Sequence, residues 1–275
     1  MCKRRFNAFY TLLGTFNLTD KDNRMIDLRL GDCLEVMKTI EDNSIDAIIT
    51  DPPFGTTACK WDSVIPFDPM WEQLNRIIKP NGAIVLFGAE PFSSALRMNN
   101  IKDYKYDWTW QKNKPTGNFL AKRQPMRALE QISVFYKKQS TYNPQKIKRT
   151  PEEFKACYRK NDSVYNNGEQ FGKGTKGFLI RKTEKEQWYK HPINLIKFDL
   201  PDGRKGKQHP TQKPVELMEY LIKTYTNEDE TVLDFTMGSG STMVACKNLN
   251  RNGIGIEKEE KYFKIAQERI NSTLF

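Results

Sequence analysis

The residue types best suited to chemistry in this chain stand together in Asp51-Pro52-Pro53-Phe54. This segment follows a strand-like run, Ile45 to Thr50, that indicates a buried strand. The prolines fix φ and remove competing N–H donors. The Asp51 carboxylate and the Pro52 carbonyl can therefore converge on an amine, while the ring of Phe54 stacks on a planar group. A simple strand-to-loop turn is the competing interpretation, and two prolines followed by an aromatic residue disfavour it.

A second cluster of suitable residues follows the strand-like run Thr231 to Leu233. Gly238 and Gly240 let the backbone turn sharply and approach a ligand closely. Glu257 ends the next predicted strand, where a carboxylate can accept hydrogen bonds from both hydroxyls of a ribose. The candidate cofactor-binding residues of this cluster are Asp234, Phe235, Thr236, Gly238, Ser239, Gly240, Ser241, Thr242 and Glu257.

The pattern of this glycine loop restricts the cofactor. A dinucleotide-binding loop would carry a third glycine where this chain has Met243, and the Gly-Lys-Ser/Thr of a P-loop is absent. S-adenosyl-L-methionine contains an adenosine but no pyrophosphate, so it fits the loop better. An ordinary strand–helix turn with glycines remains the alternative, because short glycine patterns are common.

The elements that must position these residues alternate along the chain. Continuous apolar strands such as 83–87 are typical of parallel sheets. The alternation predicts an α/β fold with a doubly wound, mostly parallel sheet, in which ligands bind at the carboxyl ends of strands. Strands are predicted at 26–30, 45–50, 83–87, 108–111, 131–136, 231–235 and 253–257, and helices at 34–40, 71–78, 214–226, 241–249 and 259–270.

The chain divides into three parts by composition. Residues 1–24 form an N-terminal extension: basic residues precede an apolar stretch as in a signal peptide, but polar residues interrupt it and no cleavage site stands out. Met25 is the expected start of the catalytic domain, which comprises 25–136 and 208–275. Residues 137–207 are an insertion of polar, basic text without a clear period. A chain that begins at Met25 is expected to keep its activity.

Charge is concentrated in the middle of the chain. The net charge is +10, but residues 112–213 hold 24 Lys and Arg against 9 Asp and Glu, while the remainder is acidic. Such a block indicates binding to a polyanion. The aromatic residues of the insertion 137–207 are expected to form a small core of their own. The candidate DNA-binding residues are Lys146, Lys148, Arg149, Arg159, Lys160, Lys173, Lys176, Arg181 and Lys182.

Other classes of protein are disfavoured by the composition. The five cysteines are scattered and form no C-x-x-C pair, and only two histidines are present, so we expect no metal site and no disulfide framework. The longest apolar run, Ala83 to Ala89, is too short to span a bilayer. A cytoplasmic protein is expected.

The order of the motifs resembles the β-group of DNA adenine-N6/cytosine-N4 methyltransferases. The Asp-Pro-Pro-Phe segment comes first, then the basic insertion, then 209–214 (His-Pro-Thr-Gln-Lys-Pro), then the glycine loop. The resemblance covers most of the chain from Met25 to Ile270. It implies a Rossmann-like methyltransferase fold that is circularly permuted, with the cofactor strands last. One departure is that the loop has Thr236 where the family usually has Phe, with Phe235 one position earlier.

The resemblance also implies roles and partners. Asp51 to Phe54 are the catalytic segment, Asp32 contacts the cofactor's adenine, and Thr211, Gln212 and Lys213 lie near its methionine end. The insertion 137–207 becomes the target-recognition region. The implied partners are double-stranded DNA in the nucleoid, a cognate restriction endonuclease and a second copy of the chain.

The expected reaction is methyl transfer to the exocyclic N6 amine of a flipped-out adenine in duplex DNA. Cytosine-N4 methylation stays open, although that branch more often has Ser at the position of Asp51. Cytosine-C5 chemistry is disfavoured because it needs a cysteine after a proline, and the chain has no Pro-Cys pair. A methyltransferase acting on RNA or protein amines, and an inactive nucleic-acid-binding module, are the remaining alternatives.

Overall fold

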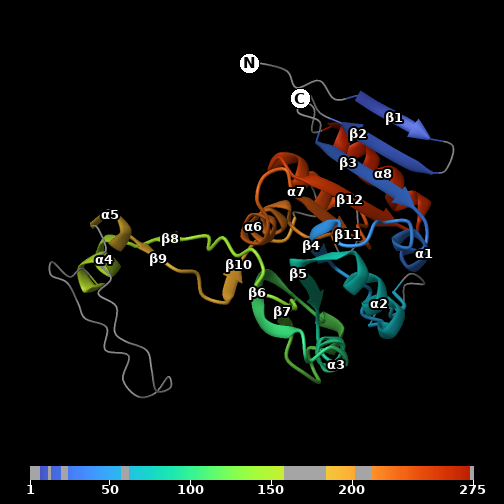
Figure 1. The fold of residues 1–275 in the computed structure, drawn as a ribbon. Coiled ribbons are helices and arrows are strands. Elements are labelled where there is room, and N and C mark those ends of the chain that lie inside the picture. The colour runs from blue at the N-terminus through green and yellow to red at the C-terminus, as the bar shows by residue number, and fades with distance from the viewer. Residues whose placement is uncertain are drawn as a thin grey trace. The chain divides into compact units, whose positions relative to one another are not determined.

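The computed structural model describes residues 7–11, 14–19, 24–56, 62–157, 184–201 and 212–272. The chain forms two compact units. Unit 1 comprises Met1–Asn143 and Asn194–Phe275, and unit 2 comprises Pro144–Ile193. Unit 1 contains the large sheet and the helices that cover it (Figure 1).

The sheet of unit 1 has ten strands. From β3 through β5 the neighbouring strands are parallel, whereas β2 joins β3, β7 joins β5 and β6 joins β7 in antiparallel fashion. The mostly parallel α/β fold predicted from the alternation is confirmed. In spatial order the strands are β1 (Asn7–Thr11), β2 (Thr15–Thr19), β3 (Met25–Leu30), β12 (Asn252–Glu257), β11 (Thr231–Asp234), β4 (Ile45–Thr50), β5 (Ile78–Gly88), β7 (Arg127–Phe135), β6 (Tyr104–Thr116) and β10 (Leu195–Lys197).

Helices cover both faces of this sheet. One core cluster packs the face that carries Ala47 and Ile49 against three helices, α6 (Val215–Tyr225), α7 (Ser241–Asn248) and α8 (Glu260–Ser272). The other packs the face that carries Ile48 against α1 (Cys33–Met37), α2 (Phe67–Ile77) and α3 (Phe92–Asn99). Because side chains of β4 alternate between two buried faces, its central residues Ala47, Ile48 and Ile49 are all apolar.

The order of the strands is that of a permuted doubly wound sheet. The central strands β11 and β4 are neighbours, with Leu233 opposite Ile48, although they lie far apart along the chain. Parallel pairing brings the carboxyl ends of β3, β12, β11 and β4 to one edge. The residues after these strands are therefore held side by side, whichever comes first in sequence.

The N-terminal extension contributes to the sheet in a way the sequence did not predict. β2 pairs along β3, and Phe16 and Leu18 on it are 0% and 1% exposed in the core. The alternation of Phe16, Asn17 and Leu18 is that of a half-buried strand. A domain that starts at Met25 would leave this side of β3 without its neighbour, so the structure argues against Met25 as the boundary of the folded unit.

The helix predicted at 71–78 is only partly right, and the residues that follow it, 79–82, do not form the expected loop. α2 does end at Ile77, but the chain continues at once into β5, so 79–82 are strand residues. A Cβ at Gly82 would lie 2.8 Å from the backbone oxygen of Asp46 on β4. Glycine is thus needed there for the close approach of two strands.

Unit 2 is small and contains β8 (Ile147–Lys148) paired with β9 (Tyr189–Lys190), together with α4 (Pro151–Cys157) and α5 (Glu184–Gln187). Phe154 and Trp188 stack with centroids 4.0 Å apart at 6°. Unit 2 covers fewer residues than the predicted insertion 137–207, because β10 pairs with β6 in the main sheet and therefore belongs to unit 1. None of the described helices is both long and apolar enough to cross a bilayer.

Candidate active site

A cavity of about 820 Å³ opens in unit 1 at the carboxyl edge of the parallel strands. Its wall includes Asp32 after β3, the Asp51–Phe54 segment after β4, the loop after β11, and Glu257 at the end of β12. This is the edge at which doubly wound sheets bind ligands. The size of the cavity suits a nucleoside-sized ligand together with a second planar group.

Asp51 stands in this wall as a buried acid. Its Oδ2 accepts a hydrogen bond of 2.6 Å from Nζ of Lys213, and its backbone carbonyl accepts one of 3.0 Å from Oγ1 of Thr236. Burial raises the pKa of Asp51 to about 6, although Lys213 opposes the shift. Oδ1 of Asp51 is buried and has no hydrogen-bond partner among the described residues. One carboxylate oxygen therefore remains available to a donor from a ligand.

The loop after Asp51 is held in shape by Asp62. The two oxygens of Asp62 accept hydrogen bonds from the backbone N–H groups of Gly55, at 2.9 Å, and Thr56, at 3.0 Å. Gly55 has a φ of +68°, which glycine adopts without strain. The ring of Phe54 packs 5.1 Å from that of Phe92. The aromatic face that follows the two prolines is thus fixed against the core.

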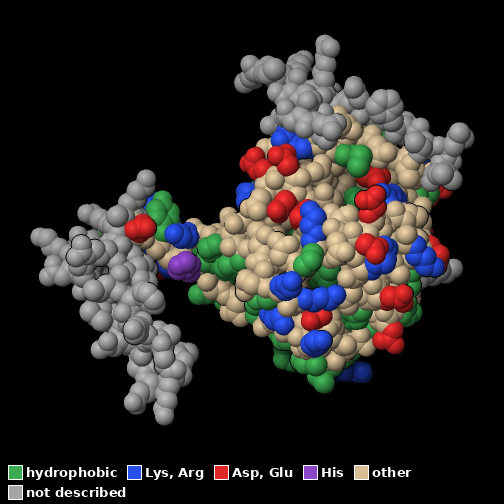
Figure 2. Space-filling view, viewed as in Figure 1, with side chains coloured by type: hydrophobic (Ala, Val, Ile, Leu, Met, Phe, Trp, Pro, Cys, Tyr) green, Lys and Arg blue, Asp and Glu red, His purple; other side chains and the backbone are tan. Residues whose placement is uncertain are grey.

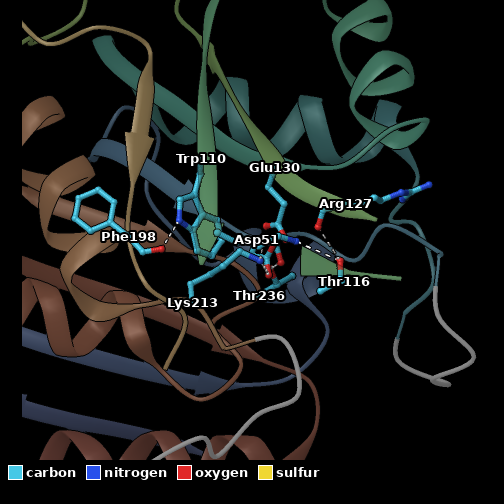
Figure 3. A network of polar contacts seen from close by, with 9 residues as sticks. Asp51, Trp110, Thr116, Arg127, Glu130, Phe198, Lys213 and Thr236 are labelled. Atoms are coloured by element: carbon cyan, nitrogen blue, oxygen red, sulfur yellow. Dashed lines mark hydrogen bonds and ion pairs between the residues drawn. The ribbon is translucent and has the colours of Figure 1, made fainter. Parts of the chain in front are cut away.

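A chain of alternating charges extends from Asp51 into the sheet (Figure 3). Lys213 is 8% exposed and lies 3.4 Å from Oε2 of Glu130 as well as 2.6 Å from Asp51. Oε1 of Glu130 in turn accepts a hydrogen bond of 2.9 Å from Lys112, which is 7% exposed. Two carboxylates and two ammonium groups balance each other in a buried site.

The direction of the pKa shifts follows from this pairing. Burial alone would raise the pKa of Glu130, but Lys213 and Lys112 outweigh it and the pKa is lowered. Burial would lower the pKa of Lys213, but Asp51 and Glu130 outweigh it and the pKa is raised. Lys213 is therefore a fixed cation beside the Asp51 carboxylate at neutral pH.

Sequence reasoning missed Lys112 and Glu130. A signal was present: Trp108, Trp110 and Lys112 alternate along β6, and the first two are core residues. Glu130 holds the same relation to Ile132 and Val134 along β7. A charged residue at a core-facing strand position requires a partner, and the cross-strand pair supplies it.

The loop after β11 is organised by Asp234, which is 4% exposed. Oδ1 of Asp234 accepts hydrogen bonds from Oγ1 of Thr50, at 3.0 Å, and from the backbone N–H of Thr236, at 3.2 Å, and Oδ2 accepts one from Thr242. Burial raises the pKa of Asp234 to about 7 against these hydrogen bonds. Asp234 joins the strand β4 and the start of α7, so its first role is to shape the loop.

Gly238 and Gly240 in the loop after β11 are required for two different reasons. Gly238 has a φ of +53° and its N–H donates a 2.9 Å hydrogen bond to Oε2 of Glu257. Gly240 has a φ of +76°, and a Cβ there would lie 2.9 Å from Cβ of Ala266 on α8. Gly238 ties the loop to the end of β12, whereas Gly240 permits close packing at the N-cap of α7.

Two acidic residues stand at the far strands of the cavity. Asp32 caps α1 by accepting a 3.0 Å hydrogen bond from the N–H of Leu34, and Nζ of Lys258 lies 3.4 Å from its Oδ2. Glu257 accepts from the N–H of Glu259 at 2.7 Å as well as from Gly238. Burial raises the pKa of Glu257. Both carboxylates are oriented by backbone donors.

The structure brings most of the predicted site residues to this one cavity. Gly240 lies behind the loop as the N-cap of α7 and does not line it, and Thr211 lies outside the described residues. Within the described residues, no three His, Cys, Asp or Glu side chains are placed to hold a metal ion. The predicted residues that line the cavity are Asp32, Asp51, Pro52, Pro53, Phe54, Gln212, Lys213, Asp234, Phe235, Thr236, Gly238, Ser239, Ser241, Thr242 and Glu257.

The predicted DNA-binding residues are described only in part. Nζ of Lys148 lies 5.9 Å from the ring centroid of Trp188, and Nε of Arg149 donates to the carbonyl of Gln187 at 3.0 Å. Lys146, Lys148 and Arg149 belong to unit 2. Those that lie outside the described residues are Arg159, Lys160, Lys173, Lys176, Arg181 and Lys182.

Known proteins share this sequence and fold. A family model described as DNA methylase, of N6 and N4 type, matches residues 45–268. The type II methyltransferase M.HpaI of Haemophilus parainfluenzae is 32% identical over 91% of this chain and 75% of its own length. M.HinfI of Haemophilus influenzae is 28% identical over 87% of this chain and 67% of its own length.

Solved structures agree. That of an M1.HpyAVI–SAM complex matches with a TM-score of 0.56 and 28% identity, over 88% of this chain and 98% of that one. The cytosine-N4-specific PvuII methyltransferase, 17% identical, shares the fold with a TM-score of 0.60, over 90% of each chain. The family resemblance inferred from the motif order is confirmed: this chain belongs to the N6/N4 DNA methylase family.

Proposed function

We propose that this protein transfers a methyl group from S-adenosyl-L-methionine to the exocyclic N6 amine of an adenine flipped out of duplex DNA. The observation that carries the proposal is the Asp51 carboxyl group. It lines the same cavity as the glycine loop, and one of its oxygens has no hydrogen-bond partner among the described residues. An N–H group of an amine is the donor that would satisfy this carboxylate oxygen.

The residues of the cavity fit S-adenosyl-L-methionine. Glu257 and Asp32 are acceptors for ribose hydroxyls and for an adenine amine, and the backbone at Gly238 allows close approach. The relative whose structure contains SAM is similar over most of this chain. When bound, the cofactor supplies a methyl group activated by its sulfonium.

The residues of this chain then act on the base. A base amine is a weak nucleophile because its lone pair is delocalised into the ring. Asp51 and the Pro52 carbonyl accept hydrogen bonds from its two N–H groups, and the Asp51 carboxylate stabilises the positive charge that develops on the nitrogen until one proton leaves. Phe54, packed on Phe92, offers a fixed face for the extruded base. Lys213 keeps Asp51 ionised before the amine arrives.

Adenine is favoured over cytosine by the acid at position 51. The resemblance associates cytosine-N4 members more often with Ser at this position. The alternative reactions, at cytosine N4 or at amines of RNA or protein, would use the same carboxylate and the same cofactor loop. We further propose that the insertion 137–207, which contains unit 2, reads the DNA sequence. We also propose that the protein acts on nucleoid DNA in the cytoplasm, has a restriction endonuclease partner and forms a homodimer.

The test is transfer of labelled methyl from S-adenosyl-L-methionine to unmodified DNA, followed by nucleoside digestion and mass spectrometry. We expect N6-methyladenine from the wild type and none from Asp51→Ala. Calorimetry should show that Asp51→Ala binds the cofactor with the affinity of the wild type. N4-methylcytosine would overturn the choice of base. Label found only on RNA or protein would overturn the substrate, and wild-type turnover by Asp51→Ala would remove Asp51 from its role.

A further inference from the structure

A basic, acid-free segment connects β6 to β7. Thr116 at the end of β6 pairs with Arg127 at the start of β7, and residues 113–127 form what we call the hairpin tip. It contains Lys114, Lys122 and Arg123 as well as Arg127, and no Asp or Glu. Figure 2 shows Lys and Arg side chains, with Asp and Glu side chains among them, over the part of unit 1 where Figure 1 draws β6 and β7.

The hairpin tip presents an aromatic side chain to solvent. Phe119, in the short 3-10 helix η1 (Asn118–Leu120), is 104% exposed. Leu120 and Met126 beside it are 45% and 38% exposed. Gly117, which starts this turn with a φ of +97°, has no atom within 4 Å of the place a Cβ would take. Phe119 thus stands clear of the fold that carries it.

The two arms of the hairpin tip end at the active-site cavity. Lys114, Pro115 and Thr116 on one arm and Arg127 on the other line the same cavity as Asp51. Oγ1 of Thr116 donates to the carbonyl of Arg127 at 3.4 Å, and Figure 3 shows the Arg127 side chain extending away from the charge network. Phe119 is therefore carried on the rim through which a base must enter.

The chemistry of this segment selects its partner. Four cations without an acid match a polyanion, and an exposed aromatic ring matches a partner with stacked planar faces. A nucleic acid is both. A protein surface would more commonly meet an apolar patch whose charged residues are of both signs.

We propose that the hairpin tip docks on DNA and inserts Phe119 into the base stack at the position that the target base leaves. This inference rests on the proposed function. The ring replaces stacking that the neighbouring base pairs lose when the target base is extruded. Lys122 and Arg123 hold the flanking phosphates and so keep the ring in register.

The experiment compares Phe119→Ala with Met98→Ala, a matched control that removes a side chain that is 70% exposed on α3 and does not line the cavity. The DNA is a duplex that carries the methylation site mapped by sequencing a plasmid grown with the wild-type protein. Single-turnover methyl transfer is measured on the fully paired duplex and on one with an abasic site opposite the target base. The abasic duplex does not need an inserted side chain, or wedge, to replace the target base, because the target base is already unpaired.

We expect Phe119→Ala to lower the rate on the paired duplex about tenfold or more, and to fall within about twofold of wild type on the abasic duplex. Phe119→Trp should restore the paired rate, and Met98→Ala should match wild type on both. Lys122→Ala with Arg123→Ala should reduce the slope of log Kd against log salt by about two.

Three outcomes would overturn the inference. An unchanged paired rate in Phe119→Ala, with an active wild type, would refute the wedge alone. An equal loss on both duplexes would mean that the ring acts elsewhere than on base extrusion. A changed sedimentation coefficient without a changed rate would assign Phe119 to contact with a second copy. A wild type that methylates no DNA would instead refute the proposed function, and is recognised before any variant is made.

Discussion

Replacing Lys213 with methionine should move the pH dependence of methyl transfer. Lys213 is the buried cation 2.6 Å from Asp51 and 3.4 Å from Glu130, and methionine keeps the length of its stem without the charge. Its removal leaves the two carboxylates with Lys112 as their remaining buried cation among the described residues. The carboxylate of Asp51 loses its main counter-charge, so the protonated form of Asp51 becomes more stable relative to the ionised form and its pKa rises.

The magnitude follows from the pairing. Breaking a buried ion pair by removing one partner costs about 3–5 kcal/mol, and one pKa unit corresponds to about 1.4 kcal/mol. We take the lower end, because Lys213 also serves Glu130. A loss of about 3 kcal/mol would raise the pKa of Asp51 by about 2 from its value of about 6. The ionised form that the reaction needs would then appear only near pH 8.

The assay is kcat/KM at limiting cofactor and limiting DNA, which reports groups of the free enzyme. Activity of the wild type should rise with pH through about 6, the pKa of Asp51, because the proposed mechanism uses the ionised carboxylate. The variant should rise through about 8, so that it is about 25-fold slower at pH 6.5 and close to wild type at pH 9. Lys213→Arg should restore the wild-type profile.

Two controls separate this effect from others. Lys79→Met removes the cation of another ion pair, 2.7 Å from Asp46 and outside the cavity lining, and should leave the pH profile unchanged. Calorimetry should show whether Lys213→Met also weakens the binding of the cofactor. Weaker binding would lower the activity equally at every pH. A variant whose acidic limb stays at about 6 would refute the role given to Lys213.

Two further predictions test the structural basis of the site. Phe16→Ala should lower the free energy of unfolding by about 3–5 kcal/mol in urea titrations, because Phe16 is fully buried on β2. The same substitution at the exposed Phe119 should change it by less than about 0.5 kcal/mol. If the two variants were equally stable, β2 would be dispensable for the fold. Thr50→Val removes the hydroxyl that donates to Asp234 and accepts from the N–H of Phe235, so it should cost about 1–3 kcal/mol and weaken cofactor binding. Thr224 is equally buried, but its hydroxyl donates only to a carbonyl of its own helix, so Thr224→Val should be nearly neutral in a thermal melt. A matching loss there would contradict the argument.

The fold could be predicted wherever the sequence has a strong period. β4 was placed correctly, and residues 83–87 of β5 were found because they form a continuous apolar run covered on both faces, whereas the polar residues 79–81 near the start of β5 were not predicted as strand. α3 was missed because its N-cap Pro91 makes no side-chain cap hydrogen bond and its eight residues are too few for a clear period, although Phe92, Ala95 and Leu96 have helical spacing. β2 was missed because its neighbouring segment resembled an interrupted leader, although its own alternation was readable.

The site divides in the same way. Asp51, Asp234 and Glu257 could be found because each ends a strand, and a parallel sheet collects such ends at one edge. The contact between Lys213 and Asp51 could not be found by spacing, because 162 positions separate them. Glu130 and Lys112 sit on strands that were predicted only in part, so their pairing had no register from which to be read.

The separation of the two motifs along the chain has a physical reason to be tolerated. β4 and β11 pair directly, and Oγ1 of Thr236 donates to the carbonyl of Asp51, so the two loops share hydrogen bonds across 185 positions. The entropy of closing a long loop grows only slowly with its length. The chain between them can therefore carry both the hairpin tip and unit 2 at little cost to the catalytic edge. The hairpin tip and unit 2, which we propose contact DNA, can therefore change in length and sequence while the carboxylate and the glycine loop keep their geometry.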